Sequence, residues 1–200
     1  MKIGNTWKHK IVPVATLRDF AETEETLSLL REGGLLVIEI TYRTAYAREA
    51  VKYAAKHYPD IFVGAGTIVN EEQCLNAIEA GAKFIVGPGF SAGVAAVCEE
   101  KGVPYLPGTV TPTEIMAAID CGLDAVKFFP YSCFGELAGV NALSAPFPSV
   151  KFMLTNGITE ENCAELLRHK RVIGVGGSWM LKGTREEKLA KIKKAAQVCI

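Results

Sequence analysis

The sequence of 200 residues has no excess of charge of either sign, because 22 lysines and arginines balance 22 aspartates and glutamates. A neutral chain has no overall field that attracts nucleic acid or an anionic membrane surface, so neither is expected as a partner. No apolar run approaches the roughly 20 residues that cross a bilayer. Residues 1–10, MKIGNTWKHK, lack the apolar stretch of a secretion signal. We therefore expect a cytoplasmic protein.

Histidines are scarce and cysteines follow no binding pattern. His9, His57 and His169 lie in the N-terminal arm or in helical segments, so no metal site is expected. The six cysteines, at positions 74, 98, 121, 133, 163 and 199, contain no CxxC spacing. Packed, reduced thiols of a cytosolic protein are the expectation, with Cys133 set apart by its closeness to Lys127.

What the sequence does contain is a regular alternation of strand-like and helical segments. Segments with helical periodicity separate the strand-like runs, and another follows the last run. The spacing of about 20 to 25 residues per unit is typical of a parallel sheet whose strands are joined by helices. The eight strand-like runs are 11–14, 37–41, 61–67, 84–89, 105–110, 125–130, 150–155 and 172–178.

The ends of the helical segments agree with this reading. Glycine closes four of them, in EGG, EAG, EKG and DCG, and Asn70, Thr111 and Thr159 each begin one with glutamate in the first turn. Eight such units predict an α/β fold, a (β/α)₈ TIM barrel, as a single domain over 1–200. A doubly wound open sheet is the alternative, but it usually has fewer strands and no early GxGxxG opens a helix here.

Lys127 is a cation within an apolar strand, DAVKFFP, and lysine is seldom buried unless paired or functional. Glu39, Thr41 and Arg43 alternate along the second strand and are predicted to face one way. A structural pair between Glu39 and Arg43 is one reading, but it leaves Lys127 unexplained. Apolar neighbours and a second cation disfavour a charged amine, and a neutral amine adds to a carbonyl to form a Schiff base. Glu39 could then move protons while Arg43 binds a substrate carboxylate.

Two glycine-rich turns, TNGIT and GVGGS, follow the seventh and eighth predicted strands. Barrels often bind phosphate at these turns through backbone N–H groups. We therefore expect a substrate with a 2-oxo acid at one end and a phosphate at the other. Further polar or glycine positions at predicted strand ends are Thr67, Pro88, Gly89, Thr109, Thr111, Thr155, Asn156, Gly157, Gly176, Gly177 and Ser178.

Two stretches, GLLVIEITYRT (34–44) and GLDAVKFFPYSCFG (122–135), resemble signature regions of the 2-keto-3-deoxy-6-phosphogluconate (KDPG) and 4-hydroxy-2-oxoglutarate (KHG) aldolase family. GAGT, GPG, PGTVTPTE, APF and GGSW follow in the family's order, so the resemblance runs from about residue 11 to 180. It implies a class I aldolase without metal or organic cofactor, forming homotrimers. It also implies cleavage of KDPG to pyruvate and glyceraldehyde 3-phosphate, with KHG as a second substrate.

By this resemblance, Lys127 is the Schiff-base lysine, Glu39 the general acid/base, and Arg43 and Thr67 the carboxylate contacts. The resemblance makes Phe129 the wall beside the lysine, and Gly157, Gly176, Gly177 and Ser178 the phosphate loops. Pro88 and Thr155 complete the expected substrate site. Thr155 favours the gluconate substrate over its galactonate epimer. An aldolase for that epimer, or a phosphosugar-binding barrel without imine chemistry, remains as an alternative.

The sequence departs from the family pattern at three positions. Tyr42 replaces a leucine or phenylalanine and is expected to face the helices. Tyr131 replaces a small residue after KFFP and is expected to narrow the mouth of the site. Asn156 replaces the first glycine of a TGG turn, which either alters the phosphate geometry or adds a hydrogen bond.

Overall fold

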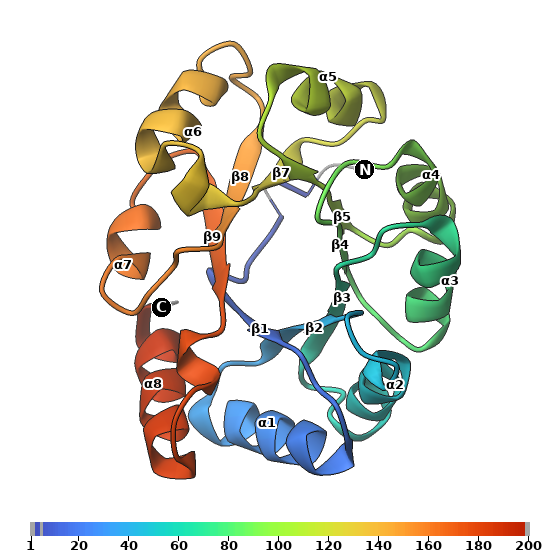
Figure 1. Ribbon diagram of the computed structural model, residues 1–200, viewed down its shortest axis with the longest axis vertical. Helices are drawn as coiled ribbons and strands as arrows, with labels where there is room; N and C mark the ends of the chain where they lie inside the picture. The colour runs from blue at the N-terminus through green and yellow to red at the C-terminus, as the bar shows by residue number, and fades with distance from the viewer. Residues whose placement is uncertain (1–2, 5, 199–200) are drawn as a thin grey trace.

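Parallel strands surround a central axis and helices cover them on the outside in the computed structural model, which describes residues 3–4 and 6–198 (Figure 1). In that part of the chain the strands form one sheet of nine, in the order β5-β4-β3-β2-β1-β9-β8-β7-β6. The strands are β1 (Ile11–Ala15), β2 (Val37–Thr41), β3 (Phe62–Gly66), β4 (Ile85–Val86), β5 (Tyr105–Leu106), β6 (Gly108–Thr109), β7 (Ala125–Phe128), β8 (Lys151–Thr155) and β9 (Val172–Gly177). The predicted barrel is confirmed.

The one extra strand comes from Pro107, which interrupts the predicted strand 105–110. β5 pairs with β4 on one side and β6 pairs with β7 on the other, so this segment joins the two edges of the sheet. Proline has no backbone N–H to donate to a neighbouring strand. The prediction of one continuous strand here was therefore wrong, although the segment still closes the ring.

The helices follow the strands as the alternation predicts. They are α1 (Phe20–Gly33), α2 (Ala47–His57), α3 (Glu71–Glu79), α4 (Ala92–Lys101), α5 (Pro112–Asp120), α6 (Glu136–Ser144), α7 (Cys163–Leu166) and α8 (Arg185–Val198), with 3₁₀ turns η1 (Tyr131–Cys133) and η2 (Trp179–Leu181). Asn70 and Thr111 cap α3 and α5 as predicted, and Gly34 and Gly102 end α1 and α4 in the left-handed conformation. None of the described helices is long and apolar enough to cross a membrane.

The helix predicted over 159–170 is much shorter than expected. Thr159 and Asn162 hydrogen-bond each other's backbone N–H through their side chains, so the chain turns before α7 starts. Such local side-chain bonds compete with helical hydrogen bonding. Thr159 therefore stabilises a turn, and Asn162 is the residue that precedes the helix.

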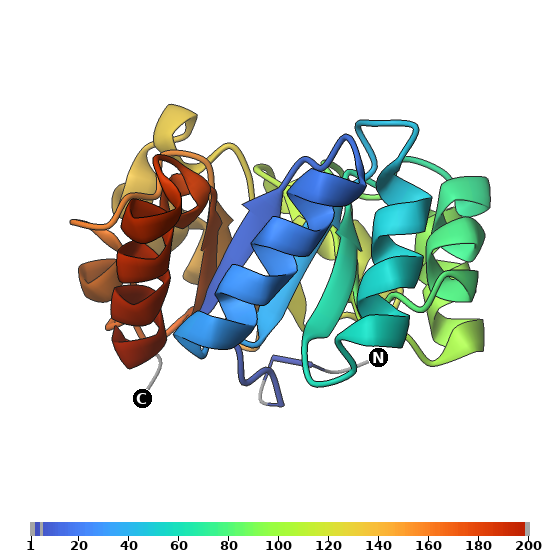
Figure 2. The same cartoon turned by 90° about the horizontal axis from the view of Figure 1, so that it is seen from below.

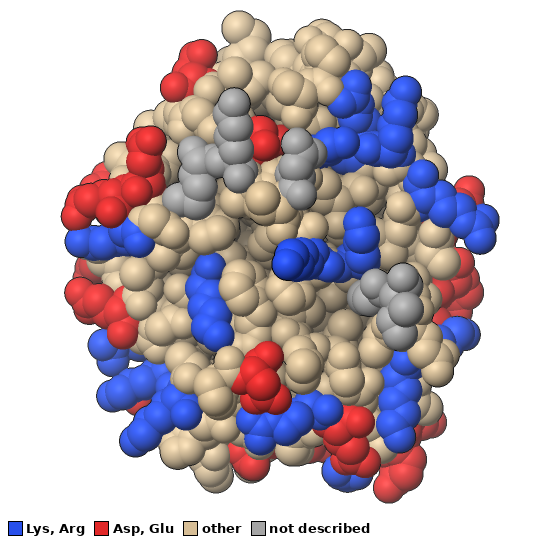
Figure 3. Space-filling model, turned by 180° about the vertical axis from the view of Figure 1, so that it is seen from behind, with Lys and Arg blue, Asp and Glu red and all other residues tan. Residues whose placement is uncertain are grey.

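The two ends of the barrel differ. The loops after the strands gather at one end, and the N-terminal arm runs across the other (Figure 2). Trp7 packs its ring edge-on against Phe62 and Phe84, and Asp124 accepts hydrogen bonds from the backbone of Ile3 and Gly4. The face on that side carries basic and acidic side chains together (Figure 3). The arm thus closes this end, and a site has to lie at the other.

Cys74, Cys98, Cys121 and Cys133 are free thiols. Cys74 and Cys98 are buried, with their sulfur atoms 3.5 Å apart, and Cys163 is buried as well. Cys133, which the sequence set apart from the packed thiols, is exposed. Cys199 lies outside the described residues.

Candidate active site

A cavity of about 970 Å³ opens at the end of the barrel where the strands finish. Loops at that end come from every strand–helix connection, so side chains distant in sequence meet there. The predicted catalytic and binding residues all line this cavity: Glu39, Arg43, Thr67, Pro88, Lys127, Phe129, Thr155, Gly157, Gly176, Gly177 and Ser178.

Lys127 and Glu39 form a buried pair at the centre of this cavity. Lys127, on β7, is 8% exposed and Glu39, on β2, is 1% exposed. The lysine Nζ lies 4.0 Å from Oε1 of Glu39 and 4.8 Å from the centre of the Phe129 ring. A buried charge is stable only with such partners. The carboxylate's other oxygen, Oε2, is buried and has no hydrogen-bond partner among the described residues, so its capacity to accept a hydrogen bond is unused.

The neighbouring strand leaves room for Glu39. On β3, any Cβ at Gly66 would run into the Glu39 carboxylate. Gly66 pairs with Thr41 across the two strands, which places it beside the end of β2. Glycine at this position therefore permits a carboxylate inside the barrel.

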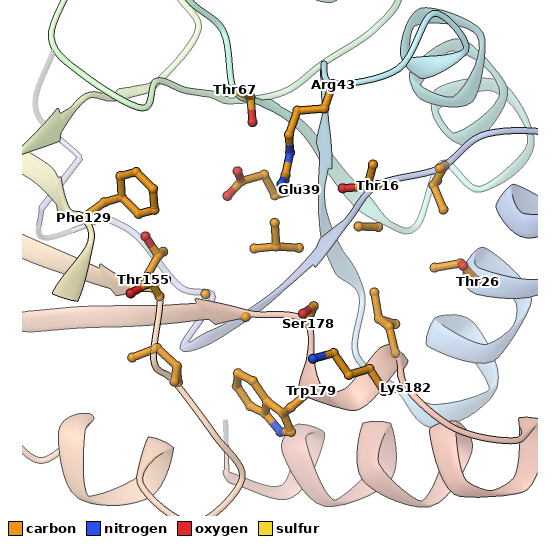
Figure 4. Close-up of a pocket in the computed structure, with 18 of the residues that line it drawn as sticks. Thr16, Thr26, Glu39, Arg43, Thr67, Phe129, Thr155, Ser178, Trp179 and Lys182 are labelled. Atoms are coloured by element: carbon orange, nitrogen blue, oxygen red, sulfur yellow. The ribbon is translucent and has the colours of Figure 1, made fainter. Parts of the chain in front are cut away.

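Arg43 and Thr67 approach the same pair from the loops after β2 and β3 (Figure 4). The carboxylate of Glu39 has its ion-pair partner in Lys127, and no ion pair joins it to Arg43 within the described part of the chain. Arg43 is thus available to an anion. Thr67 has a φ of 61°, a left-handed conformation that is strained for a β-branched residue and is often found at functional sites.

Thr41 does not reach the cavity, contrary to its predicted place beside Glu39 and Arg43. Its buried hydroxyl lies 2.9 Å from the hydroxyl of Thr16, and Thr16 lines the cavity instead. Thr41 therefore holds Thr16 in place through a hydrogen bond and does not line the cavity itself.

The other end of the cavity is built by the turns after β8 and β9. Thr155 is 4% exposed and its hydroxyl oxygen has no hydrogen-bond partner among the described residues. A Cβ at Gly176 would lie 2.8 Å from Cγ2 of Thr155, and one at Gly177 would meet the Trp179 ring. Only glycine allows the backbone at these two positions to approach Thr155 and Trp179 so closely.

Asn156 and Gly157 both adopt left-handed backbone conformations, with φ of 76° and 78°. Asparagine tolerates this region better than most other residues, so the turn keeps its shape without the first glycine. Ser132 donates a hydrogen bond of 2.6 Å to Oδ1 of Asn156 and fixes its amide.

The two tyrosine substitutions have different outcomes. Tyr42 faces the helices as predicted, and its hydroxyl donates to Asn76 on α3 at 3.3 Å. Burial raises the pKa of Tyr42 to about 12. Tyr131 is buried against Phe128, with ring centres 6.3 Å apart, and does not line the cavity. The expectation that Tyr131 narrows the mouth was wrong, because its ring turns outward into the layer between strands and helices.

Several lining residues were missed by the sequence reading. They lie on the loop after β1, on α1, around η2 and on α8, which is where the first and last units of the barrel meet. Applying the strand-end rule to the first strand would have found Thr16 and Arg18. Among the missed residues are Thr16, Arg18, Glu22, Glu25, Thr26, Trp179, Lys182 and Lys188.

Together, the closed parallel barrel and the buried lysine beside a carboxylate define a class of enzyme barrel suited to imine chemistry on a carbonyl substrate. A sequence model described as "Aldolase: KDPG and KHG aldolase" matches residues 4–195. The chain belongs to this KDPG and KHG aldolase family.

Individual relatives agree with the family assignment. The 2-dehydro-3-deoxy-phosphogluconate aldolase of Treponema pallidum is 40% identical over 172 residues, covering 86% of this chain and 82% of the relative. The structure of the Zymomonas mobilis KDPG aldolase with 3-phosphoglycerate has a TM-score of 0.90 at 33% identity, covering 95% of this chain and 92% of the other. The KDPG aldolase of Legionella pneumophila, with pyruvate captured as a covalent carbinolamine, has a TM-score of 0.86 at 29% identity, covering 98% and 95%.

Proposed function

We propose that this protein is a class I aldolase that cleaves KDPG into pyruvate and glyceraldehyde 3-phosphate. The observation that carries the proposal is the pair formed by Lys127 and Glu39, 4.0 Å apart and buried in the cavity at the ends of the strands. Relatives at up to 40% identity are named for this reaction. The shorter substrate KHG, which yields pyruvate and glyoxylate, shares the reacting end and is a second substrate.

The reaction begins at the lysine. The Glu39 carboxylate takes a proton from the Lys127 ammonium. The neutral amine then attacks C2 of the substrate, a proton passes from the nitrogen to the former carbonyl oxygen, and a carbinolamine forms. Glu39 gives a proton to the departing hydroxyl, water leaves, and an iminium remains. Arg43 binds the substrate carboxylate through paired N–H donors, with Thr67 beside it, and so holds C2 against the amine. Phe129 shields the imine from water.

Cleavage then uses the iminium as the electron acceptor. A proton leaves the C4 hydroxyl for the Glu39 carboxylate, the C3–C4 bond breaks, and its electron pair moves toward the iminium to give an enamine. Glyceraldehyde 3-phosphate departs as the aldehyde. Glu39 returns a proton to C3, and hydrolysis of the new iminium releases pyruvate and restores the lysine.

The distal end of the substrate lies at the glycine turns in this proposal. Gly157, Gly176, Gly177 and Ser178 offer backbone N–H groups to the phosphate, and the unpartnered hydroxyl of Thr155 meets a hydroxyl of the substrate chain. Thr155 favours the gluconate substrate over the galactonate epimer. Pro88 forms part of the opposite wall.

Trapping with borohydride tests the imine directly. Incubation with pyruvate and borohydride is expected to add one reduced pyruvyl group to Lys127, detected by mass spectrometry of the peptides. Lys127→Met should give no adduct, whereas Lys52→Met, on the exposed side of α2, should react normally. An unmodified wild-type protein would support the alternative of a phosphosugar-binding barrel without imine chemistry.

The assembly and location follow the family in this proposal. We place the enzyme in the cytoplasm as a homotrimer with no metal or organic cofactor. Sedimentation equilibrium is expected to give three times the chain mass of 21.6 kDa. A mass equal to one chain would contradict the trimer.

Comparison of kcat/KM for KDPG, its galactonate epimer and KHG ranks the substrates.

A further inference from the structure

The outer part of the cavity carries more cations than carboxylates. Arg18, Lys182 and Lys188 line it together with Glu22 and Glu25, from the loop after β1, from α1, and from the segment η2–α8. The two carboxylates are already paired: Arg18 lies 3.4 Å from Glu22, and Lys188 lies 3.0 Å from Glu25. One cation of the three remains without a counter-charge.

That cation is Lys182. Across the described residues, no carboxylate lies within 4.0 Å of its ammonium group. The carboxylates of Glu22 and Glu25 are paired with Arg18 and Lys188 instead. An uncompensated positive charge at the wall of a cavity raises the local concentration of anions and stabilises a bound one. The partner expected for Lys182 is therefore an anionic part of the ligand.

The backbone of Lys182 is fixed while its side chain extends along the cavity. The Lys182 N–H donates to the carbonyl oxygen of Trp179 at 3.4 Å, and the Lys182 carbonyl oxygen accepts from Nζ of Lys191 at 2.9 Å. The side chain reaches from there toward Ser178, with the ammonium group at that end (Figure 4). The charge thus lies near the glycine-rich segment that is proposed to bind the phosphate.

We propose that Lys182 contacts the substrate phosphate and sets the preference for phosphorylated over unphosphorylated 2-oxo acids. This inference rests on the proposed aldolase function and adds a side-chain cation to a site otherwise made of backbone N–H groups. A phosphate dianion has charge that these dipoles only partly balance, and an ammonium group binds it as a point charge. KHG lacks the phosphate, so it gains nothing from Lys182.

The first test compares two substrates in three variants. Lys182→Met is expected to lower kcat/KM for KDPG about tenfold, mostly through KM, because the contact lies away from the reacting atoms. The value for KHG should change less than twofold. Lys182→Arg keeps the charge and should retain most of the KDPG value, and Lys52→Met is the matched control on α2. Equal losses with both substrates, or no loss with either, would overturn the role of Lys182.

The second test does not depend on turnover. Calorimetric titration with inorganic phosphate is expected to show about tenfold weaker binding to Lys182→Met than to the wild type, and near wild-type binding to Lys182→Arg. Unchanged phosphate affinity in Lys182→Met would overturn the contact. The two proposals can fail separately. If the wild type forms no Lys127 adduct but Lys182→Met still binds phosphate more weakly, the aldolase mechanism is rejected and the phosphate contact is kept.

Discussion

At the scale of one residue, Glu39 shows how a barrel accommodates a buried carboxylate beside a lysine. The strand β2 carries it into the interior, Gly66 on the next strand leaves space for it, and Lys127 on the far side supplies a counter-charge at 4.0 Å. One carboxylate oxygen stays without a hydrogen-bond partner in the described structure. A buried oxygen without a hydrogen-bond partner costs stability, which fits the proton-transfer role proposed for Glu39.

Replacing Glu39 by glutamine removes proton transfer and keeps the shape. Glu39→Gln is expected to lower kcat by about 10² or more, since general acid–base catalysis contributes roughly 10² to 10⁴. The trapped pyruvyl adduct on Lys127 should form more slowly but should still appear. Steady-state kinetics and timed trapping check both effects, with Glu72→Gln on the surface of α3 as control. A variant with unchanged kcat would remove Glu39 from the proton path.

Asn156 provides a second test at this scale, through its backbone. Its φ of 76° is costly for alanine but not for glycine. Asn156→Ala is expected to lower the free energy of unfolding by about 1 to 2 kcal/mol, and Asn156→Gly by clearly less. Chemical denaturation measures both. Ser132→Ala isolates the hydrogen bond to the amide, worth about 1 kcal/mol. Equal losses in the alanine and glycine variants would assign the effect to that bond instead.

At the scale of single elements, helix α5 has the most complete N-terminus. The Thr111 hydroxyl accepts from the Glu114 N–H at 3.4 Å, and the Glu114 carboxylate accepts from the N–H groups of Val110 and Thr111 at 2.8 Å each. Pro112 occupies the first turn, where its missing N–H costs nothing. This capping box begins α5 directly after β6, which completes the ring of strands.

The charge on Glu114 makes the stability of α5 depend on pH. Partial burial alone would raise the pKa of Glu114, but the hydrogen bonds from Val110 and Thr111 hold that pKa below its usual value. A carboxyl whose pKa is lower in the folded state stabilises the protein above its unfolded pKa. The benefit is lost as pH falls through the folded pKa.

Glu114→Gln is accordingly expected to reduce the free energy of unfolding by about 1 kcal/mol at pH 7. The difference from the wild type should shrink as the pH is lowered below about 4. Denaturation across this pH range measures the difference, with Glu79→Gln at the exposed end of α3 as control. A difference that stays constant with pH would show that the amide and not the charge accounts for it.

For the whole molecule, closure depends on the contact between the first and last helices. The ion pairs Lys188–Glu25 and Arg185–Glu32 join α8 to α1 at 3.0 and 2.7 Å. Beneath them Gly33 and Ile192 are buried, and a Cβ at Gly33 would run into the Ile192 side chain. Glycine near the end of α1 therefore lets the last helix approach the first.

Gly33→Ala tests this close approach. Alanine favours helices by about 1 kcal/mol over glycine, yet here it should destabilise the protein by about 1 to 3 kcal/mol through overpacking. In the background of Ile192→Ala the same change should be neutral or stabilising. A double-mutant cycle measured by thermal or chemical unfolding gives the coupling. Additive effects would mean that α1 and α8 adjust to each other without strain.

Local sequence patterns alone were enough to predict the repeated strand–helix unit and to single out the residues proposed to react. Apolar runs, glycine helix ends and a lysine inside DAVKFFP are local signals, because burial and backbone conformation constrain each position separately. They predicted the barrel and placed Lys127, Glu39 and Arg43 at the ends of its strands, and the structure confirms the barrel and brings these three residues to one cavity.

Which side chains meet depends on the packing of the folded barrel. The segment around Pro107 forms two strands because residues before and after the proline pair with different neighbours. The Tyr131 ring turns outward and packs against the Phe128 ring. Whether Lys182 or Lys188 is left without a carboxylate depends on how α8 packs against α1. Distances across a barrel arise from packing between elements far apart in the chain, and no local pattern of residues encodes them.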